Sequence, residues 1–373
     1  MWKPALLLAV SLTAIAQAQT PQELVQDAIQ KQKAGDLEGA VREYTEFLEA
    51  HPDVAPIRAN LGAALAGLGR YEEAIKEYKI ALKLAPATPG VSLNLALAYY
   101  KMGRIDDASA ILVKVHKAEP ANYQATLLLA DCYLRMGQNK DTIRILEPVA
   151  KVQPDDFAVV YMLGTAYIRD KQLEQGEVVI DRILRNGESA EAHLLLGMAK
   201  FEALDYKAAI GDLTKAVEMN PNLPDLYSYL GQAQMASGDM IAARTAFEKA
   251  LQSNPNDFES NVRLAVLLKQ DGDYARAQQL LARALLVRPG EPAALYQVGS
   301  TYLAAGDLDH ARATLEQVVK QSPQFLEAHV SLAQVYYRQR RKEDGDRERV
   351  LVQQLKAEQD AHQSKGESIN KPQ

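Results

Sequence analysis

Prolines recur at a fixed interval of 34 residues, and this interval constrains the fold more than any other feature of the sequence. Two groups of four keep the spacing: Pro52, Pro86, Pro120 and Pro154, then Pro221, Pro255, Pro289 and Pro323. The 67 residues between Pro154 and Pro221 fit two repeats, one of which lacks its proline and one residue. Such a period predicts stacked repeats rather than a few ordinary globular domains in a chain of 373 residues.

The repeats align when each is numbered to end two residues after its proline, so that proline occupies position 32. The predicted boundaries are 21–54, 55–88, 89–122, 123–156, 157–189, 190–223, 224–257, 258–291, 292–325 and a partial repeat at 326–340. Position 8 then holds only small residues: Ala28, Gly62, Ala96, Ala130, Gly164, Gly197, Gly231, Ala265, Gly299 and Ala333. Position 24 is large and apolar, as in Tyr44, Tyr78, Leu112, Leu146, Ile180, Leu213, Phe247, Leu281 and Leu315.

These positions resemble the tetratricopeptide repeat family, whose pattern is W-x-x-L-G-x-x-Y, then A-x-x-x-F, then P. Position 7 is leucine in most repeats, and position 11 is often tyrosine, as at Tyr99 and Tyr133. The sequence departs from the family at position 4, where polar residues such as Arg58 and His193 replace tryptophan. The resemblance implies an all-α protein, a right-handed α-solenoid of about ten helical hairpins.

The same positions explain why helical hairpins should form. Positions 4, 7, 8 and 11 lie on one helix face, and positions 20, 24 and 27 lie on one face of a second helix. Glycine at position 15, as in Gly35, accepts the left-handed conformation that ends the first helix. Proline at position 32 cannot continue the second helix. Pro148 falls inside such a helix and is expected to kink it.

The two ends of the chain differ from the repeats. Residues 341–363 are strongly charged and are expected to form a capping helix, and residues 364–373 are expected to be a disordered tail. At the other end, Lys3, an apolar run from Ala5 to Ala16, and Ala18 predict a signal peptide over residues 1–18. An uncleaved anchor is the alternative. Cleavage predicts a periplasmic or secreted bacterial protein with no stable membrane anchor.

Composition and motifs argue against several functions. A net charge of -6 without basic blocks excludes nucleic acid as a partner. The single cysteine, Cys132, is expected to be a small buried residue, and the six histidines lack metal-ligand spacing. No phosphate loop or nucleophile elbow is present. We therefore expect no enzymatic activity, no catalytic residues, no cofactor and no metal site.

Partner-binding residues are inferred from the resemblance, because positions 2, 5, 9, 12 and 13 of the family tend to face a concave groove. Positions 5, 9 and 12 provide an apolar line, flanked by cations at position 13 in three repeats. The candidates are Leu93, Tyr100, Lys101, Leu127, Leu134, Arg135, Tyr161, Ile168, Arg169, Leu194, Met198, Phe201 and Met235. Such a surface would suit a segment with apolar anchors and acidic residues. The alternative is that position 12 packs against the next hairpin and position 13 is solvated.

The predicted function is a non-enzymatic interaction scaffold of the bacterial cell envelope that binds a protein or peptide segment. Assembly of an export, pilus, outer-membrane or polysaccharide system would use such a scaffold. The alternatives are an accessory subunit of an envelope peptidase or glycosyltransferase, and a glycan-binding protein. Homo-oligomerisation is left open.

Overall fold

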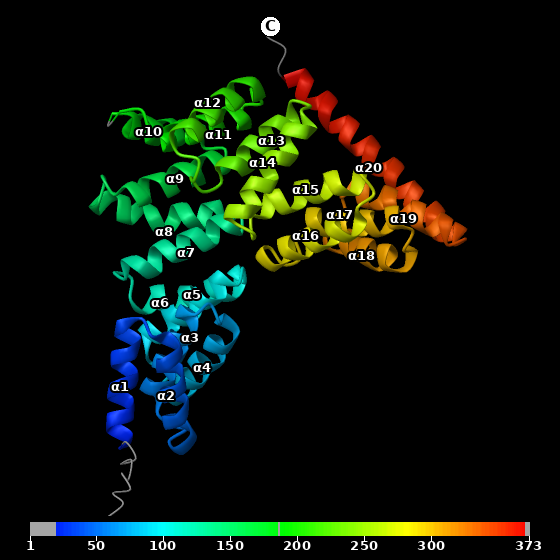
Figure 1. The fold of residues 1–373 in the computed structure, drawn as a ribbon. Coiled ribbons are helices and arrows are strands. Elements are labelled where there is room, and N and C mark those ends of the chain that lie inside the picture. The colour runs from blue at the N-terminus through cyan, green and yellow to red at the C-terminus, as the bar shows by residue number, and fades with distance from the viewer. Residues whose placement is uncertain (1–19, 186, 370–373) are drawn as a thin grey trace, which may run out of the picture. The chain divides into compact units, whose positions relative to one another are not determined.

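The computed structural model describes residues 20–185 and 187–369 and is helical throughout them, with no strand in these ranges (Figure 1). The predicted signal peptide, including Ala18, lies outside the described residues. None of the described helices is both long and apolar enough to cross a bilayer. The chain divides into two compact units, one ending at Ala98 and the other beginning at Tyr99.

The first unit contains two complete helical hairpins and most of a fifth helix. Its elements are α1 (Pro21–Ala34), α2 (Leu37–Ala50), α3 (Ala55–Gly67), α4 (Tyr71–Leu84) and α5 (Pro89–Lys101), the last of which crosses the boundary between the units. Each repeat predicted from the sequence here contains one pair of helices. The core of the unit is formed by the small residues of position 8 and the large residues of position 24, such as Ala28 and Tyr44.

The second unit continues the same alternation. It contains α6 (Ile105–Ala118), α7 (Tyr123–Arg135), α8 (Asn139–Val152), α9 (Phe157–Arg169), α10 (Leu173–Leu184), α11 (Ala190–Glu202), α12 (Tyr206–Met219), α13 (Leu226–Ala236), α14 (Met240–Ser253), α15 (Phe258–Gln270), α16 (Tyr274–Val287), α17 (Pro292–Ala305), α18 (Leu308–Gln321), α19 (Leu326–Arg338) and α20 (Lys342–Ile369). Helix α8 continues through Pro148. Each hairpin packs on the next, as predicted for a solenoid.

The turn inside every hairpin places position 15 in the left-handed conformation. Seven repeats have glycine there, as in Gly35 with φ 87°. Lys171, Leu204 and Arg340 occupy this position in the other three repeats and still have φ between 61° and 63°. The repeat therefore imposes this conformation even on residues with a Cβ atom, for which it costs about 1–2 kcal/mol.

Polar pairs replace the missing tryptophan of position 4. In three repeats the side chain at position 4 contacts a carboxylate 19 residues later, on the second helix of the hairpin. These pairs are Arg58 with Glu77 at 2.6 Å, His193 with Asp212 at 3.0 Å, and His329 with Glu348 at 2.6 Å. Arg58, Asn261 and His329 also donate to, or contact, the carbonyl of the preceding proline. In these repeats, position 4 is therefore occupied by hydrogen-bonded polar groups instead of a large ring.

Small residues at position 8 allow the two helices of a hairpin to approach closely. A Cβ atom added at Gly62 would lie 2.7 Å from the Tyr78 ring, and one added at Gly231 would lie 2.7 Å from the Phe247 ring. Both rings are almost completely buried. The absence of a side chain at these glycines is thus part of the packing.

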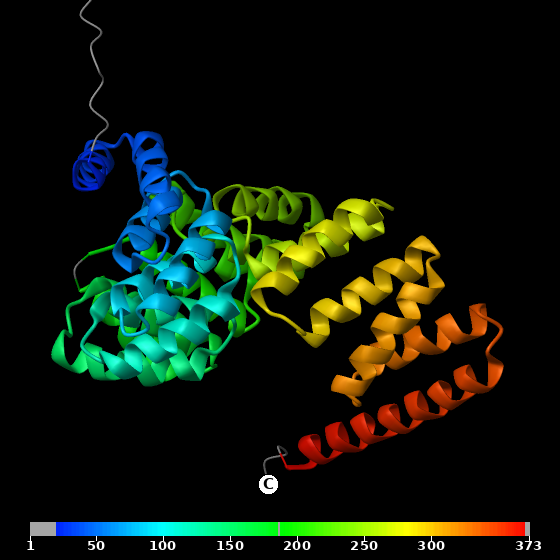
Figure 2. The ribbon, with the colours of Figure 1, turned by 90° about the horizontal axis from the view of Figure 1, so that it is seen from below.

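The C-terminal region differs from the prediction. Helix α20 packs against α19 and runs to Ile369 (Figure 2), whereas the sequence analysis placed the end of the capping helix at residue 363. Residues 364–369 read Ser-Lys-Gly-Glu-Ser-Ile and contain no proline, which would end a helix. Residues 370–373 lie outside the described part.

Candidate functional site

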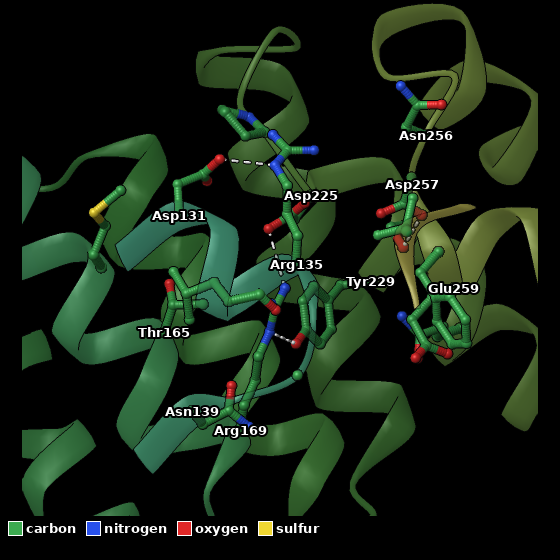
Figure 3. Close-up of a pocket in the computed structure, with 18 of the residues that line it drawn as sticks. Asp131, Arg135, Asn139, Thr165, Arg169, Asp225, Tyr229, Asn256, Asp257 and Glu259 are labelled. Atoms are coloured by element: carbon green, nitrogen blue, oxygen red, sulfur yellow. Dashed lines mark hydrogen bonds and ion pairs between the residues drawn. The ribbon is translucent and has the colours of Figure 1, made fainter. Parts of the chain in front are cut away.

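The second unit contains a cavity of about 560 Å³, lined mainly by the first helices of five successive repeats. Helices α7 and α11 contribute residues of their C-terminal halves, α9 contributes residues along its length, and α13 and α15 contribute mainly residues near and before their N-termini. The end of α16, at Val287 and Arg288, completes the wall. The family resemblance predicted a groove along the first helices of successive repeats, and Figure 3 shows side chains that line this cavity.

Position 13 supplies the last residue of α7, α9 and α11, which is Arg135, Arg169 and Glu202 in turn. The two arginines point toward acidic residues (Figure 3). Arg135 pairs with Asp131 at 2.8 Å, and its guanidinium lies 5.0 Å from the centre of the Tyr100 ring. Because of this stacking and pairing, Arg135 is not a free cation at the surface.

Arg169 occupies the middle of the cavity. Its Nε donates to the Tyr229 hydroxyl at 2.8 Å, and its Nη2 lies 3.0 Å from Asp225. Its Nη1 donates to the Leu134 carbonyl at 3.3 Å, near the end of α7. Burial would lower the pKa of Arg169, but Tyr229 and Asp225 outweigh that effect and raise it. This arginine therefore stays charged and ties α9 to α7 and α13.

Arg288 closes the cavity across a long sequence distance. Its Nε donates to the Arg135 carbonyl at 2.8 Å, and its guanidinium lies 3.9 Å from the centre of the Phe258 ring. Thus two arginines, Arg169 and Arg288, satisfy carbonyl groups at the C-terminal end of α7, where the helix dipole is negative. Asp225 and Asp257 stand correspondingly at the N-terminal ends of α13 and α15.

Several polar atoms of this wall have no partner among the described residues. The Thr165 hydroxyl is buried without a hydrogen bond, and its residue is only 2% exposed. The Asn139 Oδ1 is also buried without a hydrogen bond, and the buried Arg263 Nε has none, although it lies 3.4 Å from a Glu259 oxygen. Because buried polar groups in native proteins normally have partners, a bound molecule or water is expected at this wall.

A second cavity, of about 370 Å³, adjoins the first and shares Arg135, Asp225 and Asp257 with it. Its other walls come from the end of α5, the start of α6, and the loops that precede α13 and α15. Tyr100 lines it and donates its hydroxyl to Asp131, while Lys101 beside it is exposed.

The structure brings five of the predicted residues together at the larger cavity: Leu134, Arg135, Tyr161, Arg169 and Phe201. Tyr100 and Lys101 line the smaller cavity. Leu93, Leu127 and Met235 are half-buried, and neither cavity includes them; Leu93 belongs to the first unit.

The sequence analysis placed Ile168, Leu194 and Met198 in an apolar line facing the groove. This prediction is wrong for these three residues, which are 0% exposed. Ile168 packs toward α10, close to Gly176, and the other two belong to the core between α9 and α13. All three are core residues. The alternative stated above concerned position 12 alone, and Ile168, which holds that position, packs against α10 of its own hairpin. The surface of the cavity is mixed and charged rather than a continuous apolar line.

Sequence reasoning missed most of the polar lining. Thr165 and Asp131 stand at position 9, Asp225 at position 2 and Glu202 at position 13, all of which are groove positions in the family. The sequence analysis named only apolar and basic residues at these positions. The polar residues at the same positions could have been predicted from the repeat numbering in the same way. Arg288 and Asp257 occupy positions 31 and 34, for which the repeat pattern gives no such signal.

Histidine and cysteine residues elsewhere in the described ranges were also candidates for chemistry. No set of three or more His, Cys, Asp and Glu residues there is placed to hold a metal ion. Cys132 is buried, as expected, and burial raises the pKa of its thiol to about 12. His193 and His329 belong to the position 4 pairs.

Comparison with known proteins establishes the class. A model described as "TPR repeat" matches residues 65–103, and two described as "Tetratricopeptide repeat" match residues 110–160 and 235–298, and residues 194–258 and 296–345. The chain belongs to the tetratricopeptide repeat family. Proteins of this family are α-solenoids that bind other proteins. A comparison with curated proteins gives no match.

A solved structure with a TM-score above 0.5 shares the fold, and others are similar at lower scores. The structure titled "Crystal structure of APC/C hetero-tetramer Cut9-Hcn1" has a TM-score of 0.54 and 14% identity, and the match covers 90% of this chain and 81% of that chain. The structure "MamA 41-end from Desulfovibrio magneticus RS-1" has a TM-score of 0.43 and 22% identity, covering 47% of this chain and 98% of that chain. A further structure, titled "Crystal structure of MamA", has a TM-score of 0.40 and 20% identity, and the match covers 44% of this chain and 96% of that chain.

Proposed function

We propose that this protein is a non-enzymatic scaffold of the bacterial cell envelope that binds a segment of a partner protein in the larger cavity of its second unit. The principal support is the convergence of five first helices on one hollow with buried, unpaired polar atoms. A volume of about 560 Å³ also falls within the range typical of ligand sites. Delivery to the envelope rests on the predicted signal peptide.

Extended segments suit this cavity because its walls offer both apolar and hydrogen-bonding groups. Tyr161 and Phe201 provide half-buried rings that can pack on apolar side chains. Thr165 and Asn139 provide hydrogen-bonding atoms that a peptide backbone could satisfy. Support of an export, pilus, outer-membrane or polysaccharide assembly is the role we propose for such binding.

Site-specific photocrosslinking in the native envelope tests this function. A photoreactive phenylalanine derivative replaces Tyr161 in the cavity, or Tyr274 at the start of α16 as a matched control in the same unit. Both tyrosines are half-buried, and Tyr274 lines neither cavity. We expect a discrete crosslinked protein from the Tyr161 position and none from Tyr274. Equal capture at both positions, or capture only at Tyr274, would contradict binding in the cavity.

Localisation is tested separately by fractionation of the producing cell and N-terminal sequencing of the mature chain. Recovery in the periplasm or medium with a start near residue 19 is the expected result. A chain that begins at Met1 in the membrane fraction would support the uncleaved anchor instead.

A further inference from the structure

The charges that line the larger cavity are unequally matched. Four arginines and five carboxylates belong to its wall. Every arginine has an acidic partner: Arg135 with Asp131, Arg169 with Asp225, and both Arg263 and Arg288 with Glu259 at 3.4 Å. Arg135 and Arg169, two of the three cations that the sequence suggested for an acidic partner, are therefore already paired.

Two carboxylates, Glu202 and Asp257, form no ion pair within 4 Å, although Arg169 and Lys171 act electrostatically on Glu202, and Arg169 and Arg288 on Asp257. Asp257 accepts hydrogen bonds at one oxygen from the Ser228 hydroxyl at 2.9 Å and the Ser260 amide at 2.8 Å. Glu202, the last residue of α11, has neither a hydrogen bond nor an ion pair with another described residue. Burial raises the pKa of both carboxyl groups, and Asp225 raises that of Asp257 further. The wall holds one carboxylate more than arginines, so a cationic group bound in the cavity would relieve this cost.

Independent features of the wall also favour a cationic group. Thr165, almost completely buried, has an unpaired hydroxyl oxygen in this wall, and that oxygen can accept a hydrogen bond from an ammonium or guanidinium group. Phe201, next to Glu202, offers an aromatic ring of the kind on which cations pack. The protein itself places guanidinium groups near rings in this cavity, at Phe258 and Tyr229.

We infer that the cavity accepts a lysine or arginine side chain of the bound segment, directed toward Glu202 and Asp257. The inference rests on the proposed function and reverses the acidic partner expected from the sequence. A long basic side chain matches the site because it carries several donors on a flexible apolar stem. The stem would pack beside Phe201 while the charged end reaches the carboxylates.

Three synthetic peptides test this chemistry on the full mature chain. They share the sequence Gly-Ser-Leu-X-Leu-Ser-Gly, where X is arginine, glutamine or glutamate, and they carry a fluorescent label for anisotropy titration. The arginine peptide should bind about tenfold tighter than the glutamine peptide, which corresponds to about 1.4 kcal/mol. The glutamate peptide should bind most weakly.

Charge-neutralising variants locate the effect. Glu202→Gln and Asp257→Asn should each lower the preference for arginine over glutamine by about fivefold or more. Asparagine preserves the helix cap that Asp257 provides to Ser260, and circular dichroism checks the fold. Glu218→Gln is the matched control, because the substitution removes the same charge. Glu218 is exposed on α12 and lines neither cavity.

The possible results separate the two proposals. Equal binding of the arginine and glutamine peptides, tighter binding of the glutamate peptide, an unchanged preference in both variants, or no binding of any peptide would each overturn the inference. Crosslinking from Tyr161 alongside any of these results would retain the cavity as a binding site and reject only its preference for a cation. Loss of the Tyr161 crosslink would reject the site itself.

Discussion

Addition of a methyl group at Gly231 measures how closely α13 packs against α14. The new Cβ atom would lie 2.7 Å from both Cδ1 and Cε1 of the Phe247 ring, which is fully buried and has no free space to move into. Overpacking of this kind costs about 1–3 kcal/mol. Alanine gains about 0.5–1 kcal/mol over glycine inside a helix. Gly231→Ala should therefore destabilise the hairpin by about 1–2 kcal/mol.

A matched control and a compensating change isolate the contact. Gly211 lies inside α12, is exposed, and has no heavy atom within 4 Å of an added Cβ, so Gly211→Ala should stabilise by about 0.5–1 kcal/mol. The eighth repeat has alanine and leucine, Ala265 and Leu281, at the positions of Gly231 and Phe247. The penalty of Gly231→Ala should accordingly disappear in the Phe247→Leu background, with a coupling of about 1–2 kcal/mol.

Native-state hydrogen exchange of the α13 and α14 amides is the appropriate assay, supported by urea unfolding of the whole chain. Exchange measures the stability of individual hairpins, and repeat proteins open locally. The reasoning fails if Gly231→Ala is as stable as Gly211→Ala. It also fails if the effects at Gly231 and Phe247 add to within about 0.5 kcal/mol, because the close contact would then not determine the packing.

Three further predictions concern single residues. Leu163→Ala should cost about 2–5 kcal/mol, since Leu163 is buried at position 7; an unchanged urea midpoint would show that the position is not core. Leu204→Gly should stabilise by about 1 kcal/mol, because Leu204 has φ 63° and is 70% exposed; a lower melting temperature would contradict the strain argument. The pKa of the Cys132 thiol is about 12 in the native state and about 9 in the unfolded state. Above pH 9 the unfolded state therefore loses its thiol proton first, so the contribution of Cys132 to the free energy of unfolding is complete below pH 9 and declines as the pH rises toward 12. Cys132→Ala should lessen the alkaline decline in urea stability, and an identical pH profile would refute that role.

The hairpins could be predicted because their determinants are local and repeated. Position 15 predicts the left-handed turn from its place in the repeat, and the structure has this conformation even at Lys171 and Leu204, where the residue type argues against it. The polar pairs of position 4 were not predicted, although the constant separation of 19 residues between Arg58 and Glu77, and in the two similar pairs, was available in the sequence.

The charged cavity was only partly predictable, because its contacts depend on curvature accumulated over several repeats. Arg169 was identified from position 13, yet its partner Asp225 lies 56 residues away. The hydrogen bond from Arg288 to the Arg135 carbonyl spans 153 residues. A small rotation between successive hairpins decides whether such residues meet, and a single sequence does not define that rotation.

The hydrogen bond from Arg288 to the Arg135 carbonyl also limits how far the groove of the second unit can widen. In an open array each hairpin touches only its neighbours, so the groove can widen through small changes at every interface. In the second unit, Arg288 joins the end of α16 to the end of α7 and rests on Phe258, so the groove is closed by a bond between distant repeats. A hydrogen bond from a charged group contributes about 1.5–3 kcal/mol. Under the proposed function, a partner segment that fits within the cavity would bind without that cost, whereas a larger one would first have to break the contact, so the closure would favour short or extended segments over folded ones.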